Sequence, residues 1–494
     1  MKKIIPLILA AAIVLVMMNI VGISPSYASA DSIMTDDDAA YAQIDQQALY
    51  DELFDINSVV DISVDISKEQ IADLQKDFEY FRQKGSRSSI YRIADNVTFT
   101  VNGKKYVVSD VGIRLKGTTS RCNFYNDVLG IYNLVNFRIC FNCTFDDLED
   151  YGLETRIWKS DEEKEKRKNR TFATMKSMEL KWNITADNTY VRNIYVQELF
   201  RNYGVPVQKC SLSTLSLGGC KLGIYRFFEP VDEGFIHRYF PEKDWGGDLY
   251  KVRCTDRSPA TYSLGNDYGV ASKKKAVDYN FDLKTNVQKS RHQTLVNLLE
   301  VINNPAADQD DFDRVADMDE IAMVQAVNFA MGNQDDMRNN YNNHYVYFRK
   351  SDGKAVIIPY DNEIVMGDTY VWTAYESAMT EVSPYEEYNV RFNDRQEVPL
   401  LRQTVLKDGY FTDIYTGYLR DIVDSRWMTV DNYLPYYNIA KAHYGNKLIS
   451  KYNFMSTMKQ NIDFSMEGGE NYNGNMSIEE YLSKMKANIK QYIE

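Results

Sequence analysis

The chain has 494 residues, a formal net charge of −13 and 44% hydrophobic residues, including 37 Tyr and 22 Phe. An acidic chain repels the phosphate backbone of nucleic acids, so we expect no nucleic-acid partner. The apolar and aromatic content is too high for a disordered chain, and we therefore expect a folded protein.

The first thirty residues have the pattern of a secretory signal peptide. Lys2 and Lys3 precede an apolar stretch that ends near Val21, and small residues follow up to Ala30. We predict cleavage after Ala30 and a secreted, extracellular or cell-surface protein without a stable membrane anchor. The apolar stretch is long enough that an uncleaved anchor is the alternative. Cleavage removes two lysines and no acids, so the net charge changes from −13 to −15.

The first part of the mature chain has a polar leader followed by strand and helix patterns. Residues 31–57 are acidic and polar, and we interpret them as a solvated leader. Period-two alternation over residues 60–66 predicts a strand, and the apolar spacing of residues 68–84 predicts a helix. Short alternating segments between residues 97 and 141, with a hairpin turn at Asn102-Gly103, predict an antiparallel sheet. A mixed-charge insertion, residues 155–171, is expected to be an exposed loop or helix.

The second part of the chain is richer in helical patterns. Helices are predicted over residues 187–203, 292–303 and 318–331, and a hairpin over residues 212–228 turns at Gly218-Gly219. Residues 332–367 predict a helix end, a polar loop and two strands joined by a turn. The chain beyond about residue 375 is expected to be helical, with a final helix over residues 478–493. We therefore expect an α+β fold with an antiparallel N-terminal sheet and a largely helical C-terminal half.

Six cysteines stand at positions 122, 140, 143, 210, 220 and 254. An even number in an exported chain permits up to three disulfides. Structural zinc needs four soft ligands at paired spacing, and the four histidines are scattered singly, so we expect disulfides or buried thiols instead of a zinc site.

Carboxylates gather at the ends of the predicted elements between residues 332 and 367. A strand that ends in Asp361-x-Glu363 places two carboxylates in a loop, where a hard divalent cation can bind. Asp335 follows an apolar helix and can face the same loop. A base for the hydroxyl proton, together with a carboxylate and an amide that hold magnesium, is the arrangement that phosphoryl transfer requires. The alternative is that each Asp caps a helix or a turn.

Two predicted strands carry cations on their polar faces. Arg114 and Lys116 share one face of the first strand, and Arg138 lies on the polar face of the second. Side by side, these strands would present three cations suited to polyphosphate, although an ordinary solvated sheet face is the alternative. Glu229 lies at the end of a third, apolar strand that begins at Leu222. It is either a cap or a polar group that faces a ligand.

In this order, the motifs resemble those of the spore coat protein H (CotH) kinase family. The matching segments are Arg114-Leu-Lys-Gly-Thr-Thr-Ser120, Phe137-Arg-Ile-Cys-Phe141, Asp187-Asn-Thr-Tyr-Val-Arg192, Gly223-Ile-Tyr225 through Glu229-Pro-Val-Asp232, Gly247-Asp-Leu-Tyr-Lys251, Gly332-Asn-Gln-Asp335, Asn343-His-Tyr-Val-Tyr347, and Pro359-Tyr-Asp-Asn-Glu363 with Gly367. The resemblance covers residues 58–375, after the signal peptide (1–30) and the leader (31–57). Residues 376–494 are then expected to form a helical extension packed on this domain.

The resemblance implies an atypical protein-kinase-like fold that uses ATP and Mg²⁺ or Mn²⁺ to phosphorylate Ser or Thr of exported or surface proteins. It also implies roles for individual residues. These are Asp335 as the catalytic base, Asp361 as a metal ligand with Asn343 and Glu363 as co-ligands, Lys116 and Arg138 (with Arg114 beside them) as phosphate-facing cations, and Glu198 as the acidic partner of one of these cations.

Four positions depart from the pattern of the family. Thr118, Arg138, Tyr360 and Glu363 stand where many members have Asn, Lys, Trp, and Asp or Asn. Arg does not replace Lys freely at a phosphate, and the longer Glu363 would shift the metal site. Two alternative functions follow. One is a catalytically silent coat or surface scaffold of the same fold, and the other is an extracellular carbohydrate-active protein that uses paired carboxylates.

Overall fold

A computed structural model of the chain describes residues 44–84, 88–117, 122–126, 128, 131–255, 258–272, 276–368, 379–386, 404, 407, 409–449, 462–468 and 476–494, and the backbone of residues 32–34. The predicted signal peptide lies outside these residues, as does the Thr118-Thr-Ser120 part of the first motif. No helix in the described part of the chain combines the length and the apolar character needed to cross a membrane.

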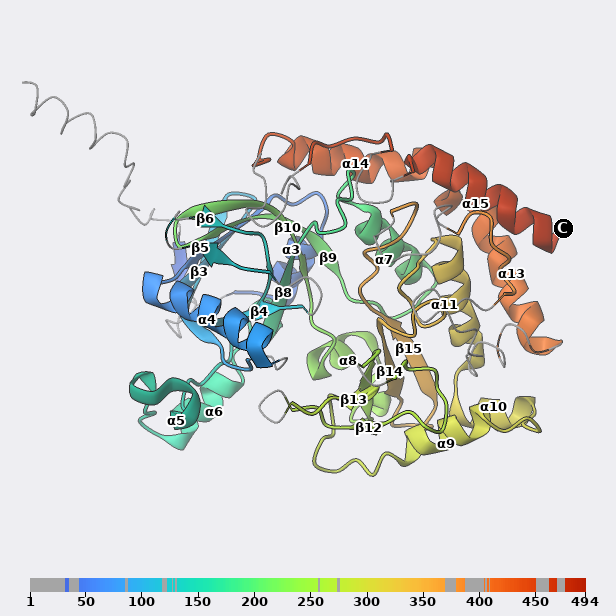
Figure 1. Ribbon diagram of the computed structural model, residues 1–494, viewed down its shortest axis with the longest axis horizontal. Helices are drawn as coiled ribbons and strands as arrows, with labels where there is room; N and C mark the ends of the chain where they lie inside the picture. The colour runs from blue at the N-terminus through green and yellow to red at the C-terminus, as the bar shows by residue number, and fades with distance from the viewer. Residues whose placement is uncertain are drawn as a thin grey trace, which may run out of the picture.

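The N-terminal part of the molecule is a closed β-barrel, on the left in Figure 1. Pairing of β4 with β7 closes the strand order β4-β3-β2-β9-β10-β8-β7. The neighbouring strands are antiparallel except β2 and β9, which run parallel. The strands are β2 (Val60–Asp65), β3 (Arg92–Val101), β4 (Lys104–Lys116), β7 (Asn136–Cys140), β8 (Ser177–Trp182), β9 (Cys210–Leu217) and β10 (Cys220–Phe228), with short strands β1 (Ser32–Met34), β5 (Tyr125–Asn126) and β6 (Ile131–Tyr132) beside them. The expected antiparallel N-terminal sheet is therefore only partly confirmed, because the sheet closes into a barrel and one pair of its strands is parallel.

A second sheet lies between the barrel and the C-terminal helices. Its strand order is β12-β13-β11-β14-β15, and only β12 and β13 are parallel. The strands are β11 (Leu249–Val252), β12 (Tyr268–Gly269), β13 (Phe281–Leu283), β14 (His344–Phe348) and β15 (Ala355–Pro359). The α+β class is confirmed, but this sheet means that the second half of the chain is less helical than expected. Beyond residue 375, the elements of the described part are helices.

The helices mostly follow the apolar periodicity of the sequence. Helix α4 occupies the predicted residues and buries Ile71, Leu74 and Phe78, and the C-terminal helix α15 also matches its predicted range. The α-helices are α3 (Gln46–Phe54), α4 (Lys68–Lys84), α5 (Leu148–Tyr151), α6 (Asp161–Lys168), α7 (Arg192–Asn202), α8 (Glu233–Tyr239), α9 (Gln293–Ile302), α10 (Gln309–Val315), α11 (Met318–Ala330), α13 (Tyr410–Asp424), α14 (Val430–Tyr444) and α15 (Ile478–Ile493), with 3₁₀ turns Gly152–Glu154, Glu242–Asp244 and Arg426–Met428.

Two local predictions about helices were wrong. Helix α3 lies within the expected solvated leader, but it buries Leu49, Tyr50, Leu53 and Phe54 and is therefore part of the fold. Helix α7 begins at Arg192 instead of near Asp187, because Tyr190 has a φ of +64° that a right-handed helix cannot contain.

Two hairpin turns and one disulfide lie in the barrel part of the molecule. Asn102 and Gly103 both have positive φ, at 49° and 85°, as the predicted hairpin turn requires. Gly218 and Gly219 likewise join β9 to β10, with φ of 53° and 79°. Cys140, at the end of β7, forms a disulfide with Cys143, whereas Cys210 and Cys220 are free thiols.

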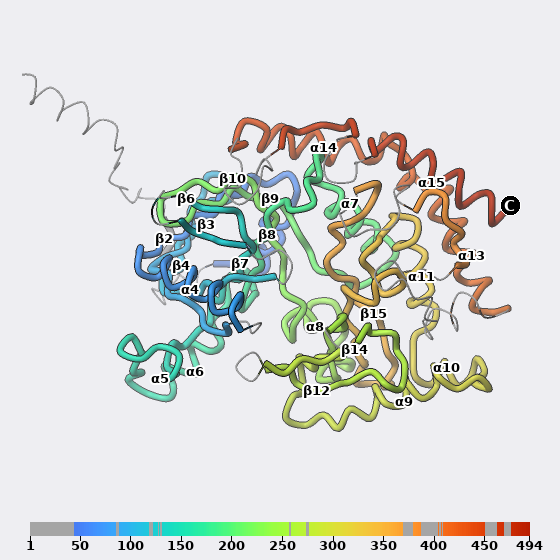
Figure 2. The backbone as a smooth tube through the Cα atoms, in the orientation of Figure 1, coloured from blue at the N-terminus to red at the C-terminus, as the bar shows by residue number. Residues whose placement is uncertain are grey.

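Each half of the molecule has an apolar core of its own. The barrel encloses one core, built from the inward side chains of its strands and from helices α3 and α4. A larger core joins helices α7, α9, α11, α13, α14 and α15 with strands of the second sheet. Figures 1 and 2 show the result, with the barrel on one side, the helices on the other, and β15 ending between them.

Candidate functional site

The end of β15 brings an acidic residue to the outer face of the barrel. Asp361 follows Pro359 and Tyr360 and has a φ of +60°, a left-handed conformation that Asp tolerates better than most residues. Its Oδ1 accepts a hydrogen bond from Nζ of Lys181 on β8. Burial would raise the pKa of Asp361, but Lys181 and Lys116 outweigh burial and lower it. Asp361 is therefore a carboxylate at neutral pH.

The loop after α11 supplies a second acidic residue, whose oxygens are held by side-chain amides. Nδ2 of Asn343 donates to Oδ2 of Asp335 over 2.7 Å, and the amides of Asn340 and Asn342 donate to Oδ1. Burial raises the pKa of Asp335 to about 7, the amide donors lower it, and the charge of Asp361 raises it further. Asp335 is thus an oriented carboxyl group that titrates near neutral pH.

Asn343 connects the two acidic residues. Its side-chain amide donates to Asp335, and its main-chain oxygen accepts a hydrogen bond from the N–H of Tyr360 over 3.1 Å. The loop after α11 and the end of β15 are therefore fixed to each other, and Asp335 and Asp361 lie close enough for one charge to affect the other.

The outer face of the barrel presents cations to this place. Leu115 and Phe137 point into the barrel core, and the alternation of a strand puts Arg114, Lys116 and Arg138 on the outside. The structure pairs the two strands that carry them, with Arg114 opposite Arg138. The predicted juxtaposition of these strands is therefore present in the molecule.

A buried glutamate on β8 is the anionic partner of these cations. Oε2 of Glu179 lies 2.9 Å from Nζ of Lys116, and Tyr360 links the two groups, since Lys116 donates to its hydroxyl over 2.8 Å and the hydroxyl donates to Glu179 over 3.0 Å. Arg138 lies 3.9 Å from the other oxygen of Glu179. Burial alone would raise the pKa of Glu179, but Lys116 and Arg138 hold it well below its usual value.

Two further cations lie deeper. Lys181 is 2% exposed and contacts Asp361 and also Glu363, whose Oε1 is 3.2 Å away. Arg226 stands directly opposite Lys181 on β10, and its Nη2 lies 3.8 Å from the same Glu363 oxygen. We call Lys116, Arg138, Glu179, Lys181, Arg226, Asp361 and Glu363 the charged cluster.

Sequence reasoning missed Glu179, Lys181 and Arg226. Residues 177–182 alternate apolar and charged side chains, so a period-two search would have predicted β8 and placed Glu179 and Lys181 on one face. Lys251 was noted only as part of a motif, yet its Nζ lies 4.1 Å from the centre of the Tyr360 ring. No comparable signal identifies Arg226, because its neighbours in sequence are apolar.

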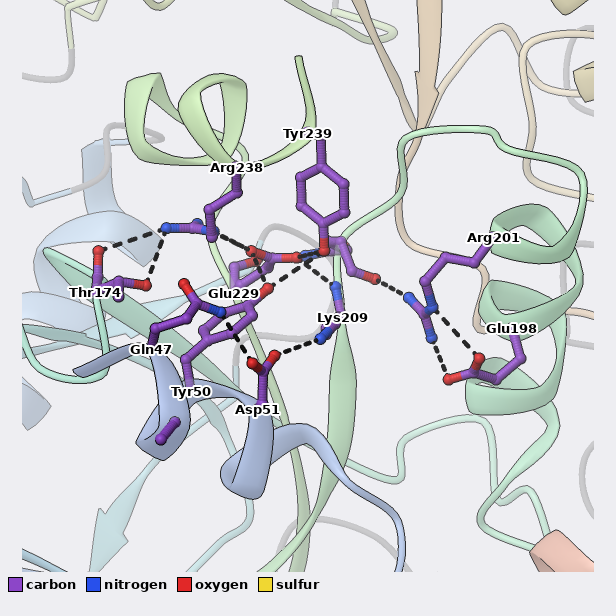
Figure 3. A network of polar contacts seen from close by, with 12 residues as sticks. Gln47, Tyr50, Asp51, Thr174, Glu198, Arg201, Lys209, Glu229, Arg238 and Tyr239 are labelled. Atoms are coloured by element: carbon purple, nitrogen blue, oxygen red, sulfur yellow. Dashed lines mark hydrogen bonds and ion pairs between the residues drawn. The ribbon is translucent and has the colours of Figure 1, made fainter. Parts of the chain in front are cut away.

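Glu198 and Glu229 lie in a different network, shown in Figure 3. The prediction that Glu198 pairs with one of the phosphate-facing cations was wrong, because Glu198 forms an ion pair with Arg201 on its own helix. A helix surface favours such i, i+3 pairs. The partner of Lys116 is Glu179 instead.

Glu229 is enclosed by donors from several elements. Its Oε1 accepts from the N–H of Lys209 over 2.7 Å and from the hydroxyl of Tyr239 over 2.6 Å. Its Oε2 accepts from the hydroxyl of Tyr50 over 2.8 Å and forms an ion pair with Arg238 at 2.9 Å. These contacts join α3, β10 and α8 (Figure 3) and assign Glu229 a structural part in the fold.

The proposed metal ligands do not form a ready-made metal site. Asp361 and Glu363 both contact Lys181, and Asn343 directs its amide hydrogens, not its oxygen, toward Asp335. Within the described residues, no three His, Cys, Asp or Glu side chains come together as a metal-binding group. Carboxylate and amide oxygens are the right donors for Mg²⁺, but here the carboxylates of Asp361 and Glu363 contact the ammonium group of Lys181.

A pocket of about 620 Å³ lies elsewhere on the second sheet. The ring centres of His237 and Trp245, which line it, are 4.1 Å apart, and Gly247, just before β11, and Tyr347, near the end of β14, line it as well. Asn343 precedes the opposite end of β14, and no residue of the charged cluster lines this pocket. The pocket is therefore separate from the site around Asp335 and Asp361.

Comparison with known proteins identifies the family of this chain. No curated protein matches it. A family model described as CotH kinase protein matches residues 149–491, which is more than half of the chain. The matched range includes Asp335, Asp361 and β8, and it continues past residue 375 into helix α15. The chain belongs to the CotH kinase protein family.

Proposed function

We propose that this chain is a secreted protein kinase that transfers the γ-phosphoryl group of ATP to a Ser or Thr hydroxyl of an exported or surface protein. Family membership supports a kinase-like function. The observation that carries the finer proposal is the position of Asp335 beside Asp361 and a set of buried cations. We also propose that the barrel and the helical half correspond to the two parts of an atypical kinase-like fold.

In this proposal the residues of the chain perform three tasks. Lys116, Arg138 and Arg226 attract and hold the negative charge of the phosphates. Asp335, oriented by Asn340 and Asn343, accepts the proton of the substrate hydroxyl. The hydroxyl oxygen then forms a bond to the γ-phosphorus while the bond from that phosphorus to the ADP oxygen breaks. Fixed cations stabilise the charge that develops on the transferred group.

The decisive experiment measures binding and transfer separately. ATP should stabilise the wild-type protein against heat, by about 2.7 kcal/mol at a hundredfold excess over its Kd, and label should pass from [γ-³²P]ATP to a mixed pool of exported proteins. Asp335→Asn should keep the ATP-induced stabilisation and lose transfer by about 100- to 10,000-fold, because a general base acts in the chemical step. Asp352→Asn, in an exposed turn, is the matched control and should retain both properties.

Other outcomes would favour the alternatives. Stabilisation by ATP without any transfer would indicate a catalytically silent, nucleotide-binding scaffold of the same family. Absence of stabilisation by ATP, with stabilisation by oligosaccharides, would favour the carbohydrate-active protein. Export is tested independently, since N-terminal sequencing of secreted material should begin at Asp31, and a secreted protein that still carries residues 4–21 would contradict it.

A further inference from the structure

Lys181 occupies an unusual position for a lysine. It is 2% exposed, and its ammonium group contacts both Asp361 and Glu363. Buried ammonium groups are rare in folded proteins unless they are paired. The two carboxylates that would bind a metal ion are therefore already neutralised, in part, by a cation of the chain itself.

The charges around Lys181 favour an anion over a second cation. Four cationic side chains surround this place, namely Lys116, Arg138, Lys181 and Arg226, and the carboxylates are Glu179, Asp335, Asp361 and Glu363. Lys251 lies beside them, but burial lowers the pKa of its amine well below the usual value. The ammonium and guanidinium groups of Lys116, Arg138, Lys181 and Arg226 therefore already match the four carboxylates, so no metal ion is needed to balance their charge.

Arg226 indicates where an anion would bind. Its side chain is 2% exposed, and Nε, Nη1 and Nη2 all lack a hydrogen-bond partner among the described residues. Glu363 is 3.8 Å away and is nearer to Lys181. Asp187 and Asp368 interact with Arg226 through their charges without a hydrogen bond to it. A buried guanidinium group whose donors make no hydrogen bond is costly, and phosphate oxygens match its donors well.

We propose that Lys181 is a built-in counter-ion for Asp361 and Glu363, so that this site binds no divalent cation on its own but binds a polyphosphate without one. The proposal rests on the proposed function, because it names how the nucleotide site of that function is charged. It also accounts for the disagreement between the predicted metal ligands and their observed contacts. Under it, the phosphates meet Arg226, Lys116 and Lys251 directly.

The test uses the full mature chain and two probes. Mn²⁺ alone is titrated and followed by electron paramagnetic resonance of the free ion, and inorganic triphosphate and ATP are titrated calorimetrically in EDTA and in Mg²⁺. We expect no saturable Mn²⁺ site below about 1 mM, and ATP and triphosphate affinities in EDTA within about tenfold of those in Mg²⁺. Lys181→Met should create saturable Mn²⁺ binding and weaken triphosphate binding in EDTA by at least about tenfold.

Matched variants separate charge from folding. Lys181→Arg keeps the cation and should behave like the wild type in the Mn²⁺ titration. Lys221→Met changes an exposed lysine of β10 and should leave both titrations unchanged. If Lys181→Met does not fold, as circular dichroism would show, the wild-type titrations alone still decide the question.

The possible failures are distinguishable. Saturable Mn²⁺ binding to the wild type, or ATP binding only in the presence of Mg²⁺, would overturn the role of Lys181 and leave the proposed kinase function standing. Absence of ATP and triphosphate binding under every condition would overturn this proposal and the nucleotide site together.

Discussion

The charged cluster and the Glu229 network are both buried and ionic, but their donors and acceptors are matched very differently. Both oxygens of Glu229 accept hydrogen bonds, and the donors come from α3, α8 and the segment before β9. In the charged cluster, by contrast, the nitrogens of Arg226 have no hydrogen-bond partner in the described part of the chain. Lys251, beside the cluster, contacts the rings of Tyr345 and Tyr360. A closed network contributes to stability, whereas an open one retains capacity for a ligand.

This difference explains why two buried acidic residues, Glu229 and Glu179, have different roles. Glu229 was a candidate ligand-facing residue because it leaves an apolar strand, and its partners Tyr50 and Tyr239 instead fix the N-terminal helix to α8. Glu179 lies in the middle of a strand and was not predicted as a site residue, yet it forms ion pairs with Lys116 and Arg138. The set of partners, not the position at a strand end, distinguishes them.

The largest expected effect on stability comes from opening the closed network. Glu229→Gln leaves Arg238, which is 13% exposed, without its anion, and we expect the free energy of unfolding to fall by about 3–5 kcal/mol. Urea denaturation measures this loss, with Glu242→Gln, at an exposed position, as the control. ATP affinity of the folded variant should be unchanged. A fall in ATP affinity without a loss of stability would return Glu229 to the nucleotide site.

A smaller, pH-dependent effect is expected at Asp336. Burial raises the pKa of Asp336 from 3.8 to about 6, although the N–H groups of Asn339 and Arg338 oppose the shift. Because the folded state binds this proton more tightly than the unfolded state, the stabilisation is complete below pH 4 and is lost as the pH rises through 6. Asp336→Asn keeps an acceptor oxygen and removes the charge. Its stability relative to wild type should therefore rise by about 3 kcal/mol between pH 4 and pH 8.

Urea denaturation of both proteins at pH 4, 5, 6, 7 and 8 measures that difference. Asp310→Asn, at an exposed position of α10, should give a difference from wild type that does not change with pH. A constant difference for Asp336→Asn as well would show that this carboxyl group has an ordinary pKa in the folded protein.

A single hydrogen bond of the closed network should have an intermediate effect. Tyr50→Phe removes the hydroxyl that donates to Glu229 over 2.8 Å, and hydrogen bonds to charged groups typically contribute about 2 kcal/mol. The control is Tyr80→Phe, since Tyr80 is 49% exposed. Combined with Glu229→Gln, the Tyr50→Phe loss should shrink, because the two residues share one contact. Fully additive losses would contradict the direct bond.

Local patterns predicted much of the fold. Helices α4 and α15 match their predicted ranges, and the Asn102-Gly103 and Gly218-Gly219 turns lie where glycine allows positive φ. Closure of the barrel could not be predicted, because the pairing of β4 with β7 and the parallel pairing of β2 with β9 join segments that are distant in sequence. Period two identifies a strand but not its neighbour.

The site was predictable only in its outline. The motifs located Asp335, Asn343 and Asp361, and the structure brings them to one place. The ion pairs among them follow from which strands are adjacent, so Lys181 could not be assigned to Asp361, nor Glu179 to Lys116, from the sequence. Glu198 of α7, predicted to pair with a phosphate-facing cation, instead pairs with Arg201 of its own helix. The direction of its side chain determines this partner, and the sequence does not show that direction.

The smallest expected effect on stability belongs to the open network. Arg226→Met replaces a buried guanidinium that has no hydrogen-bond partner with an apolar side chain of similar length. Little favourable interaction is lost, because Lys181 still pairs with Glu363 over 3.2 Å. We therefore expect a free energy of unfolding within about 1 kcal/mol of the wild type, or slightly above it. Triphosphate affinity should nevertheless fall about tenfold, because one charge-assisted contact is absent.

Urea denaturation and calorimetric titration of the same preparation measure the free energy of unfolding and the triphosphate affinity of Arg226→Met, with Lys221→Met as the control. A large loss of stability with unchanged triphosphate affinity would mean that Arg226, like Glu229, belongs to the packing of the fold.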